Sequence, residues 1–197
     1  ALAAHFSAGQ HYAWAEATYA RGRRLLGQPE AFAQELATAL GEQGKAAQAA
    51  AESLRVARQD GHLLTLAKAQ LLRLVRAPGG AEARAVEGLL LAEQDKAPDD
   101  IILRDLLADF YVHTGEWQEA LLQSRSLDRL LAEGGERLLR LGQSLQANGQ
   151  FALAEKAFSY VLTDHGAGGP QGLTALLERA RTLELQARAQ QPPDSLA

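Results

Sequence analysis

The sequence predicts an all-α fold built from repeated pairs of helices. Apolar residues recur at helical i, i+4 spacing, and no segment alternates between apolar and polar residues as a strand does. One pattern also returns after 34 residues, from Leu107 to Leu141. We therefore expect helices over residues 1–8, 11–26, 30–41, 45–59, 62–76, 81–95, 100–113, 116–131, 135–147, 151–163 and 171–189.

The repeat is clearest between residues 101 and 168. Gly115 and Gly149 each end one apolar stripe, and Trp117 or Phe151 begins the next stripe two positions later. Glycine adopts the left-handed backbone that ends a helix and reverses the chain. The other matching positions are Leu107, Ala108, Tyr111 and Ala120 in one copy, and Leu141, Gly142, Leu145 and Ala154 in the next. With weaker copies before them, the predicted units are about 1–29, 30–63, 64–98, 101–134 and 135–168.

These residues resemble the tetratricopeptide-repeat (TPR) family. The resemblance implies a right-handed α-solenoid of about five helical hairpins, in which the first helix of each hairpin lines a concave groove. The chain departs from the family pattern at the first aromatic position, which no unit fills with Trp; the residues there are Ala33, Lys68, Arg104 and Leu138. The unit around Pro78-Gly79-Gly80 is the most degenerate. We therefore expect a divergent, bacterial-type member.

The final predicted helix, 171–189, has one apolar face, formed by Leu173, Leu176, Leu177, Ala180, Leu183 and Ala187. We expect this helix to be a solvating cap that covers the open end of the stack. The alternative is a partner-mimicking or dimerising helix, so self-association through it stays open. The repeat domain would span 1–191, followed by a disordered tail at 192–197. At the other end, the repeat register predicts a first helix that begins upstream of Ala1.

The composition excludes several classes of chemistry. Of the 197 residues none is Cys, which excludes thiol nucleophiles and zinc–thiolate sites, and the net charge of −4 offers no attraction for nucleic acid. The five histidines show no metal-ligand spacing. We predict no cofactor, no metal and no catalytic site, and therefore not an enzyme. No apolar run is long enough to span a bilayer; we expect a soluble protein, either periplasmic or envelope-associated or cytoplasmic.

The resemblance also assigns the residues that face the groove. By register these are Gln34, Thr38, Ala69, Arg73, Arg76, Ile102, Asp105, Asp109, Leu139, Gln143 and Gln146. The Lys and Asn pair with which chaperone-binding members hold a C-terminal carboxylate is absent from these positions. We predict a non-catalytic scaffold that binds a peptide or partner protein through shape, hydrogen bonds and its Arg73/Arg76 and Asp105/Asp109 charges. The alternative is a sensor or regulatory segment that binds a small ligand, which would need an enclosed apolar pocket.

Overall fold

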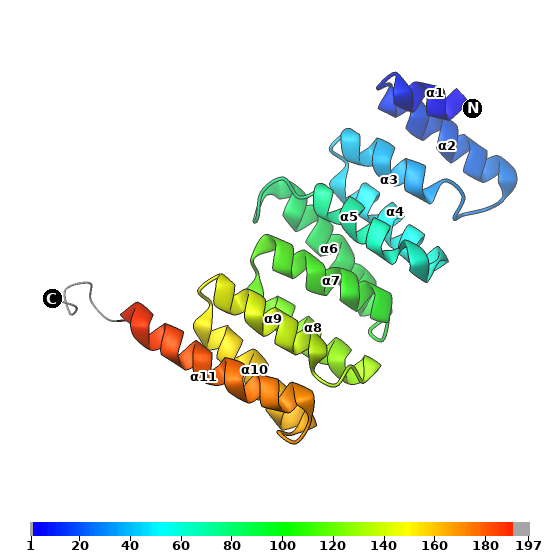
Figure 1. Cartoon of the computed structure of the whole chain (residues 1–197). Helices are drawn as coiled ribbons and strands as arrows, with labels where there is room; N and C mark the ends of the chain where they lie inside the picture. Colours follow the sequence, from blue (N-terminus) through cyan, green and yellow to red (C-terminus); the bar gives the residue numbers. More distant parts are fainter. Residues whose placement is uncertain (1, 191–197) are drawn as a thin grey trace. The chain divides into compact units, whose positions relative to one another are not determined.

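The computed structural model describes residues 2–190, and this part of the chain is helical throughout, without a strand (Figure 1). The helices are α1 (Leu2–Ala8), α2 (Tyr12–Leu26), α3 (Ala33–Glu42), α4 (Ala46–Gln59), α5 (Leu64–Arg73), α6 (Ala81–Lys96), α7 (Ile101–Thr114), α8 (Trp117–Leu131), α9 (Glu136–Ala147), α10 (Phe151–His165) and α11 (Pro170–Gln190). A single 3-10 turn, η1 (Gly61–Leu63), precedes α5. The all-α prediction is confirmed, whereas the predicted tail at 192–197 lies outside the described residues.

The described chain divides into two compact units. The first unit, residues 2–115, contains α1–α7, and the second unit, residues 116–190, contains α8–α11. The boundary follows Gly115, where the left-handed backbone (φ 79°) ends α7. The predicted hairpin 101–134 therefore has one helix in each unit.

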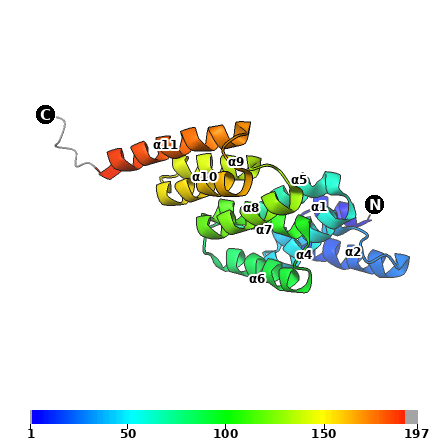
Figure 2. The same cartoon turned by 90° about the horizontal axis from the view of Figure 1, so that it is seen from below.

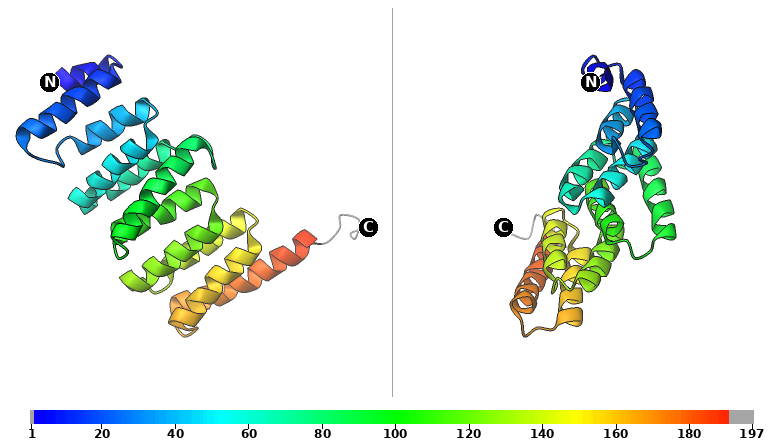
Figure 3. Two further views of the ribbon diagram at one scale, coloured as in Figure 1. Left: turned by 180° about the vertical axis from the view of Figure 1, so that it is seen from behind. Right: turned by 90° about the vertical axis from the view of Figure 1, so that its right-hand side faces the viewer.

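In the first unit, α4 is the central helix. It packs against α3, α5, α6 and α7, while α2 packs against α1 and α3 (Figure 3). Ala49, Ala50 and Ala57 of α4 are fully buried, and their small side chains allow several helices to approach it closely. Two ion pairs of α4 reinforce this packing, from Glu52 to Arg23 of α2 and from Arg58 to Asp100 before α7.

The second unit is packed more regularly. Each helix contacts both the next helix and the next but one, so that α8 packs against α9 and α10, and α9 packs against α10 and α11 (Figure 2). Gly142 lies in the middle of α9 against the ring of Phe158 from α10, and a Cβ at Gly142 would overlap that ring. Glycine is therefore required here for close helix packing, although it lowers helix propensity.

Two helices of the first unit are shorter than the sequence predicts. α3 begins at Ala33 instead of residue 30, because Phe32 adopts a left-handed backbone (φ 63°) after the turn that follows Pro29. α5 covers 64–73 instead of 62–76. The Asp60 carboxylate accepts the His62 N–H and begins a 3-10 turn in place of the first helical residues. Both differences come from backbone conformations that helical periodicity does not encode.

The last helix also differs from the expectation. α11 packs against α9 and α10, but the buried residues are Gly172, Ala175 and Thr182. The predicted apolar face points away from this contact, with Leu173, Leu176, Leu177 and Leu183 each 44% to 70% exposed. Small residues take the inner side because the backbone approaches closely there: a Cβ at Gly172 would overlap the Gly166 carbonyl.

Candidate functional site

The predicted groove residues differ widely in exposure. Gln34, Thr38, Ala69, Arg73, Arg76 and Gln143 are exposed, Ile102, Asp109 and Gln146 are half-buried, and Asp105 and Leu139 are buried. Six of the predicted polar positions belong to the first unit (Gln34, Thr38, Arg73, Arg76, Asp105 and Asp109), and two belong to the second (Gln143 and Gln146). The low exposure of Leu139 assigns it to packing.

Three of the predicted groove residues meet at one depression in the first unit. Thr38 of α3, Arg73 of α5 and Arg76, which follows α5, line it together with Glu42 and Glu82. The depression has a volume of about 90 Å³, and its charged side chains are two guanidinium groups and two carboxylates. Part of its lining comes from the predicted repeat 64–98, the most degenerate one, in which the Pro78-Gly79-Gly80 turn separates α5 from α6.

Gln70 of α5 also lines this depression and is left with an unused acceptor. Its Oε1 atom is buried, and no hydrogen-bond donor within residues 2–190 reaches it. A buried polar atom without a partner costs about 1–3 kcal/mol.

The two arginines at the rim differ in how strongly they are held. Arg73 has one long ion pair, 3.5 Å from its Nη2 to Glu42 Oε1, and its side chain is 73% exposed. Arg76 is exposed and has no hydrogen-bond or ion-pair partner among the described residues. Because neither guanidinium forms a short hydrogen bond or ion pair with the described residues, both can bind acceptors outside the chain.

The predicted acidic residues, in contrast, are paired within the first unit. Lys68 of α5 places its Nζ 2.7 Å from Asp105 and 2.8 Å from Asp109, both on α7. Desolvation by burial disfavours the charged lysine, but its hydrogen bonds to the two carboxylates outweigh that effect, so the pKa of Lys68 is raised above its ordinary value. This cluster joins α5 to α7 and reduces the negative charge that a ligand would meet.

The second unit uses one of its two predicted groove residues for packing. Gln146 Nε2 donates to the Glu178 carbonyl at 3.0 Å and to Thr182 Oγ1 at 2.7 Å, both in α11. Gln143 is exposed and lies on the same shallow surface between α9 and α11. The covering helix therefore occupies part of the surface that the repeat register assigned to a ligand.

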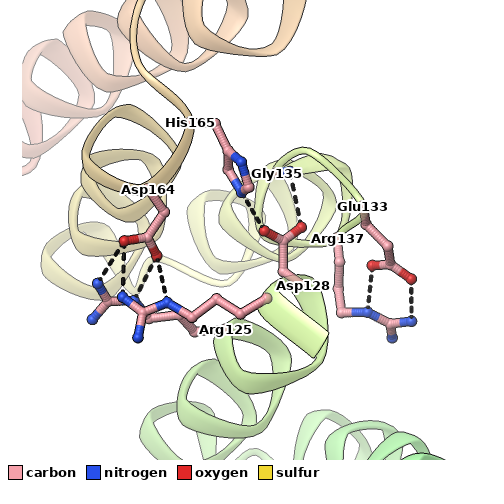
Figure 4. Close-up of polar contacts among 8 residues, drawn as sticks. Arg125, Asp128, Glu133, Gly135, Arg137, Asp164 and His165 are labelled. Atoms are coloured by element: carbon pink, nitrogen blue, oxygen red, sulfur yellow. Dashed lines mark hydrogen bonds and ion pairs between the residues drawn. The ribbon is translucent and has the colours of Figure 1, made fainter. Parts of the chain in front are cut away.

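A polar cluster in the second unit holds the α8–α9 loop against the end of α10 (Figure 4). Asp128 is fully buried; its carboxylate accepts the Gly135 N–H at 2.8 Å and lies 2.5 Å from His165 Nε2. Both carboxylate oxygens are thus used to connect the loop with α10. The sequence analysis did not single out this contact, which brings residues from three elements together.

Asp164, next to His165, forms the second half of this cluster. Arg125 and Arg129 of α8 both bind its carboxylate, at 2.9 Å in each ion pair. The hydrogen bonds from Arg125 and Arg129 lower the pKa of Asp164 far below its ordinary range, against a smaller opposing effect of burial. We assign the cluster a structural role, because its groups are already bonded to one another.

The depression in the first unit brings hydrogen-bond donors and acceptors together. Its two guanidiniums can donate and its two carboxylates can accept, which suits the alternating N–H and C=O groups of an extended peptide. No group of three His, Cys, Asp or Glu side chains that could hold a metal occurs within residues 2–190. Over the same residues, no helix has both the length and the apolar character needed to cross a membrane.

Sequence reasoning missed two residues of this region. The sequence contained a signal for Lys68, because this residue stands where the repeat pattern places an aromatic residue. It contained no signal for Gln70, because only the packing of α5 buries the oxygen of that side chain. In comparisons with known proteins, no family model matches the chain and no curated protein matches it significantly.

Proposed function

We propose that the chain is a protein-interaction module, a divergent TPR-like scaffold that binds an extended peptide across α3 and α5 of the first unit. The observation that carries the proposal is the depression where Thr38, Arg73 and Arg76 meet beside the unpartnered Gln70 oxygen. Three of these residues were assigned to the groove by repeat register alone. Their convergence supports a binding surface on α3 and α5, the first helices of the predicted repeats 30–63 and 64–98.

The helix packing also supports a repeat scaffold. Within the second unit each helix contacts its next and next-but-one neighbours, which is the pattern expected when hairpins stack in chain order. In the first unit α4 contacts α5 and α6 while α5 contacts α7, but α5 packs closely against neither α3 nor α6. The support from packing therefore comes mainly from the second unit.

The form of the depression favours a peptide over a small-molecule sensor. Sites for small ligands are usually enclosed, largely apolar and about 300–1,000 Å³ in volume. This depression has a volume of about 90 Å³ and is lined by four charged side chains. It therefore suits one or two residues of a longer chain, whose remaining contacts would extend along α3 and α5.

The test starts from a phage-displayed library of random peptides selected on the immobilised protein. The dissociation constant of an enriched peptide is then measured by fluorescence anisotropy for the wild type and for the R73A/R76A double variant. We expect the double variant to weaken binding by at least ~10-fold, because it removes two charge-assisted donors. The matched control is Arg21→Ala, at an exposed arginine of α2 outside the depression, which should change affinity by less than about twofold.

Two results would overturn the proposal. One is the absence of any peptide enriched over a blank support. The other is an enriched peptide that binds R73A/R76A as tightly as the wild type, because its site would then lie elsewhere.

A further inference from the structure

The depression in the first unit has an apolar interior and a polar rim. The lining residues of low exposure are mostly small or apolar: Ala37, Gly41, Ala46 and Leu74, with Gln70 and Glu82 as the polar exceptions. The exposed lining residues are mostly polar: Thr38, Glu42, Arg73 and Arg76, with Gly44 as the exception. Ala37 and Ala46 are the most deeply buried of the set, at 3% and 6% exposed. A side chain that enters the depression therefore meets mainly apolar groups, while most of the charged groups lie at its opening.

The small residues of α3 leave space that no neighbouring helix takes up. Ala37 and Gly41 lie one helical turn apart on α3, and residues of this size usually let a second helix approach closely. Within the described chain, however, α5 does not pack closely against α3. Only the side chain of Leu74, which follows α5, reaches Gly41: a Cβ at Gly41 would lie 2.9 Å from Leu74 Cδ2. The interior of the depression is thus a gap between two helices, bounded by small and aliphatic groups.

We propose, on the basis of the peptide-binding function proposed above, that the bound peptide places one aliphatic side chain of valine or leucine size in this interior. An apolar centre with a polar rim is the usual anatomy of a protein interface, and a side chain that fills a central pocket often contributes most of the affinity. A cavity of about 150 Å³ holds benzene, whereas this depression has a volume of about 90 Å³. It therefore suits an aliphatic side chain and is too small for an aromatic ring.

The rim would then fix the peptide around this anchor. Arg73 and Arg76 are exposed beside the interior, and neither forms a short hydrogen bond or ion pair with a described residue. Guanidinium groups bind carboxylates and backbone carbonyls strongly. The aliphatic side chain would supply affinity through burial, and the two arginines would bind acceptors of the residues next to it.

The first test replaces each aliphatic residue of the enriched peptide in turn by alanine and by asparagine. Dissociation constants for the wild-type protein are measured by fluorescence anisotropy. We expect one position at which both replacements weaken binding by at least ~10-fold, because the burial of one aliphatic side chain is lost. Phenylalanine at the same position should also weaken binding, since its ring exceeds the volume of the depression.

A second test changes the depression itself. Leu74→Ala enlarges the interior, so it should shift the preference of the protein toward the phenylalanine-substituted peptide by at least ~5-fold relative to the parent peptide. A general loss of stability would weaken both peptides alike, so the ratio of their dissociation constants is the informative quantity. Leu72→Ala, at a half-buried leucine of α5 outside the depression, is the matched control and should leave this ratio unchanged.

Results that overturn the aliphatic anchor differ from results that overturn the peptide site. An enriched peptide that loses affinity for R73A/R76A, but contains no aliphatic residue or tolerates alanine at each of them, would keep the site and overturn the anchor. Equal effects of Leu74→Ala and Leu72→Ala on the ratio would do the same. The absence of any enriched peptide, or a peptide that binds R73A/R76A as tightly as the wild type, would overturn both.

Discussion

Gln70 in the first unit and Gln146 in the second both lie on helices that begin a predicted repeat, α5 and α9, yet they meet different surroundings. The Gln146 amide donates to the Glu178 carbonyl and to Thr182 of α11. The Gln70 oxygen is buried beside an open depression and has no donor. A neighbouring helix supplies the hydrogen-bond partners of Gln146, whereas no described residue supplies one to the Gln70 oxygen. The difference separates a side chain that belongs to the packing of its unit from one that lies at the proposed site.

The largest expected effect is on the polar cluster of the second unit. Asp128→Ala should lower the free energy of unfolding of this unit by about 3 kcal/mol, because it leaves the buried Gly135 N–H and His165 without an acceptor. Urea unfolding followed by tryptophan fluorescence can measure the unfolding of the second unit separately from that of the first. The chain has two tryptophans, so in a Trp14→Phe background only Trp117 of α8 remains. Asp95→Ala, at an exposed aspartate of α6, is the control; equal effects of the two substitutions would contradict the assigned role.

A pair of glycine substitutions compares the packing within the first unit with the packing within the second. Gly142→Ala should destabilise the second unit by about 2 kcal/mol, because its Cβ would overlap the fully buried Phe158 ring. Gly41→Ala, in α3 of the first unit, meets only the Leu74 side chain at 2.9 Å, beside the depression. That side chain can move, so the gain in helix propensity should leave Gly41→Ala neutral or slightly stabilising. Thermal unfolding of both variants measures the contrast, and equal losses would show that the depression is as tightly packed as the second unit.

The Asp164 ion pairs predict a loss of stability in acid. The folded-state pKa of Asp164 lies far below its ordinary value because Arg125 and Arg129 donate to its carboxylate. The contribution of these ion pairs to the free energy of unfolding is therefore complete above about pH 4 and falls as the pH decreases below it. Urea midpoints followed by Trp117 fluorescence should therefore decrease from pH 5 to pH 2 by the equivalent of about 1–2 kcal/mol more in the wild type than in Asp164→Asn. Parallel pH profiles for the two proteins would show that the pairs contribute nothing.

The smallest expected effect compares the two glutamines directly. Gln146→Leu should cost about 1 kcal/mol, since it removes two hydrogen bonds to α11. Gln70→Leu should leave stability unchanged or raise it slightly, because it removes a buried oxygen that has no partner. A clear loss of stability in Gln70→Leu would mean that its oxygen is already satisfied.

Much of the helical structure could be predicted because its signal is local. Apolar periodicity and the glycines at helix ends located α7, α8, α9 and α10 to within two residues. The predicted beginning of α3 and the predicted limits of α5 were less accurate. They depend on a left-handed residue at Phe32 and on the Asp60 side chain, which periodicity does not reveal. Among the candidate site residues, repeat register predicted Thr38, Arg73 and Arg76, which do line one depression.

The sequence by itself determined that the described chain is all-helical, and its repeat register predicted which polar residues are candidates for a binding surface. Only the tertiary structure decided which of those residues remain free. Lys68 pairs with Asp105 and Asp109, α11 occupies Gln146, and the leucines of α11 are left exposed. The physical reason is that helical periodicity depends on neighbours three or four residues away. Pairing and burial depend on side chains from distant helices, whose approach is set by small residues such as Gly142 and Gly172.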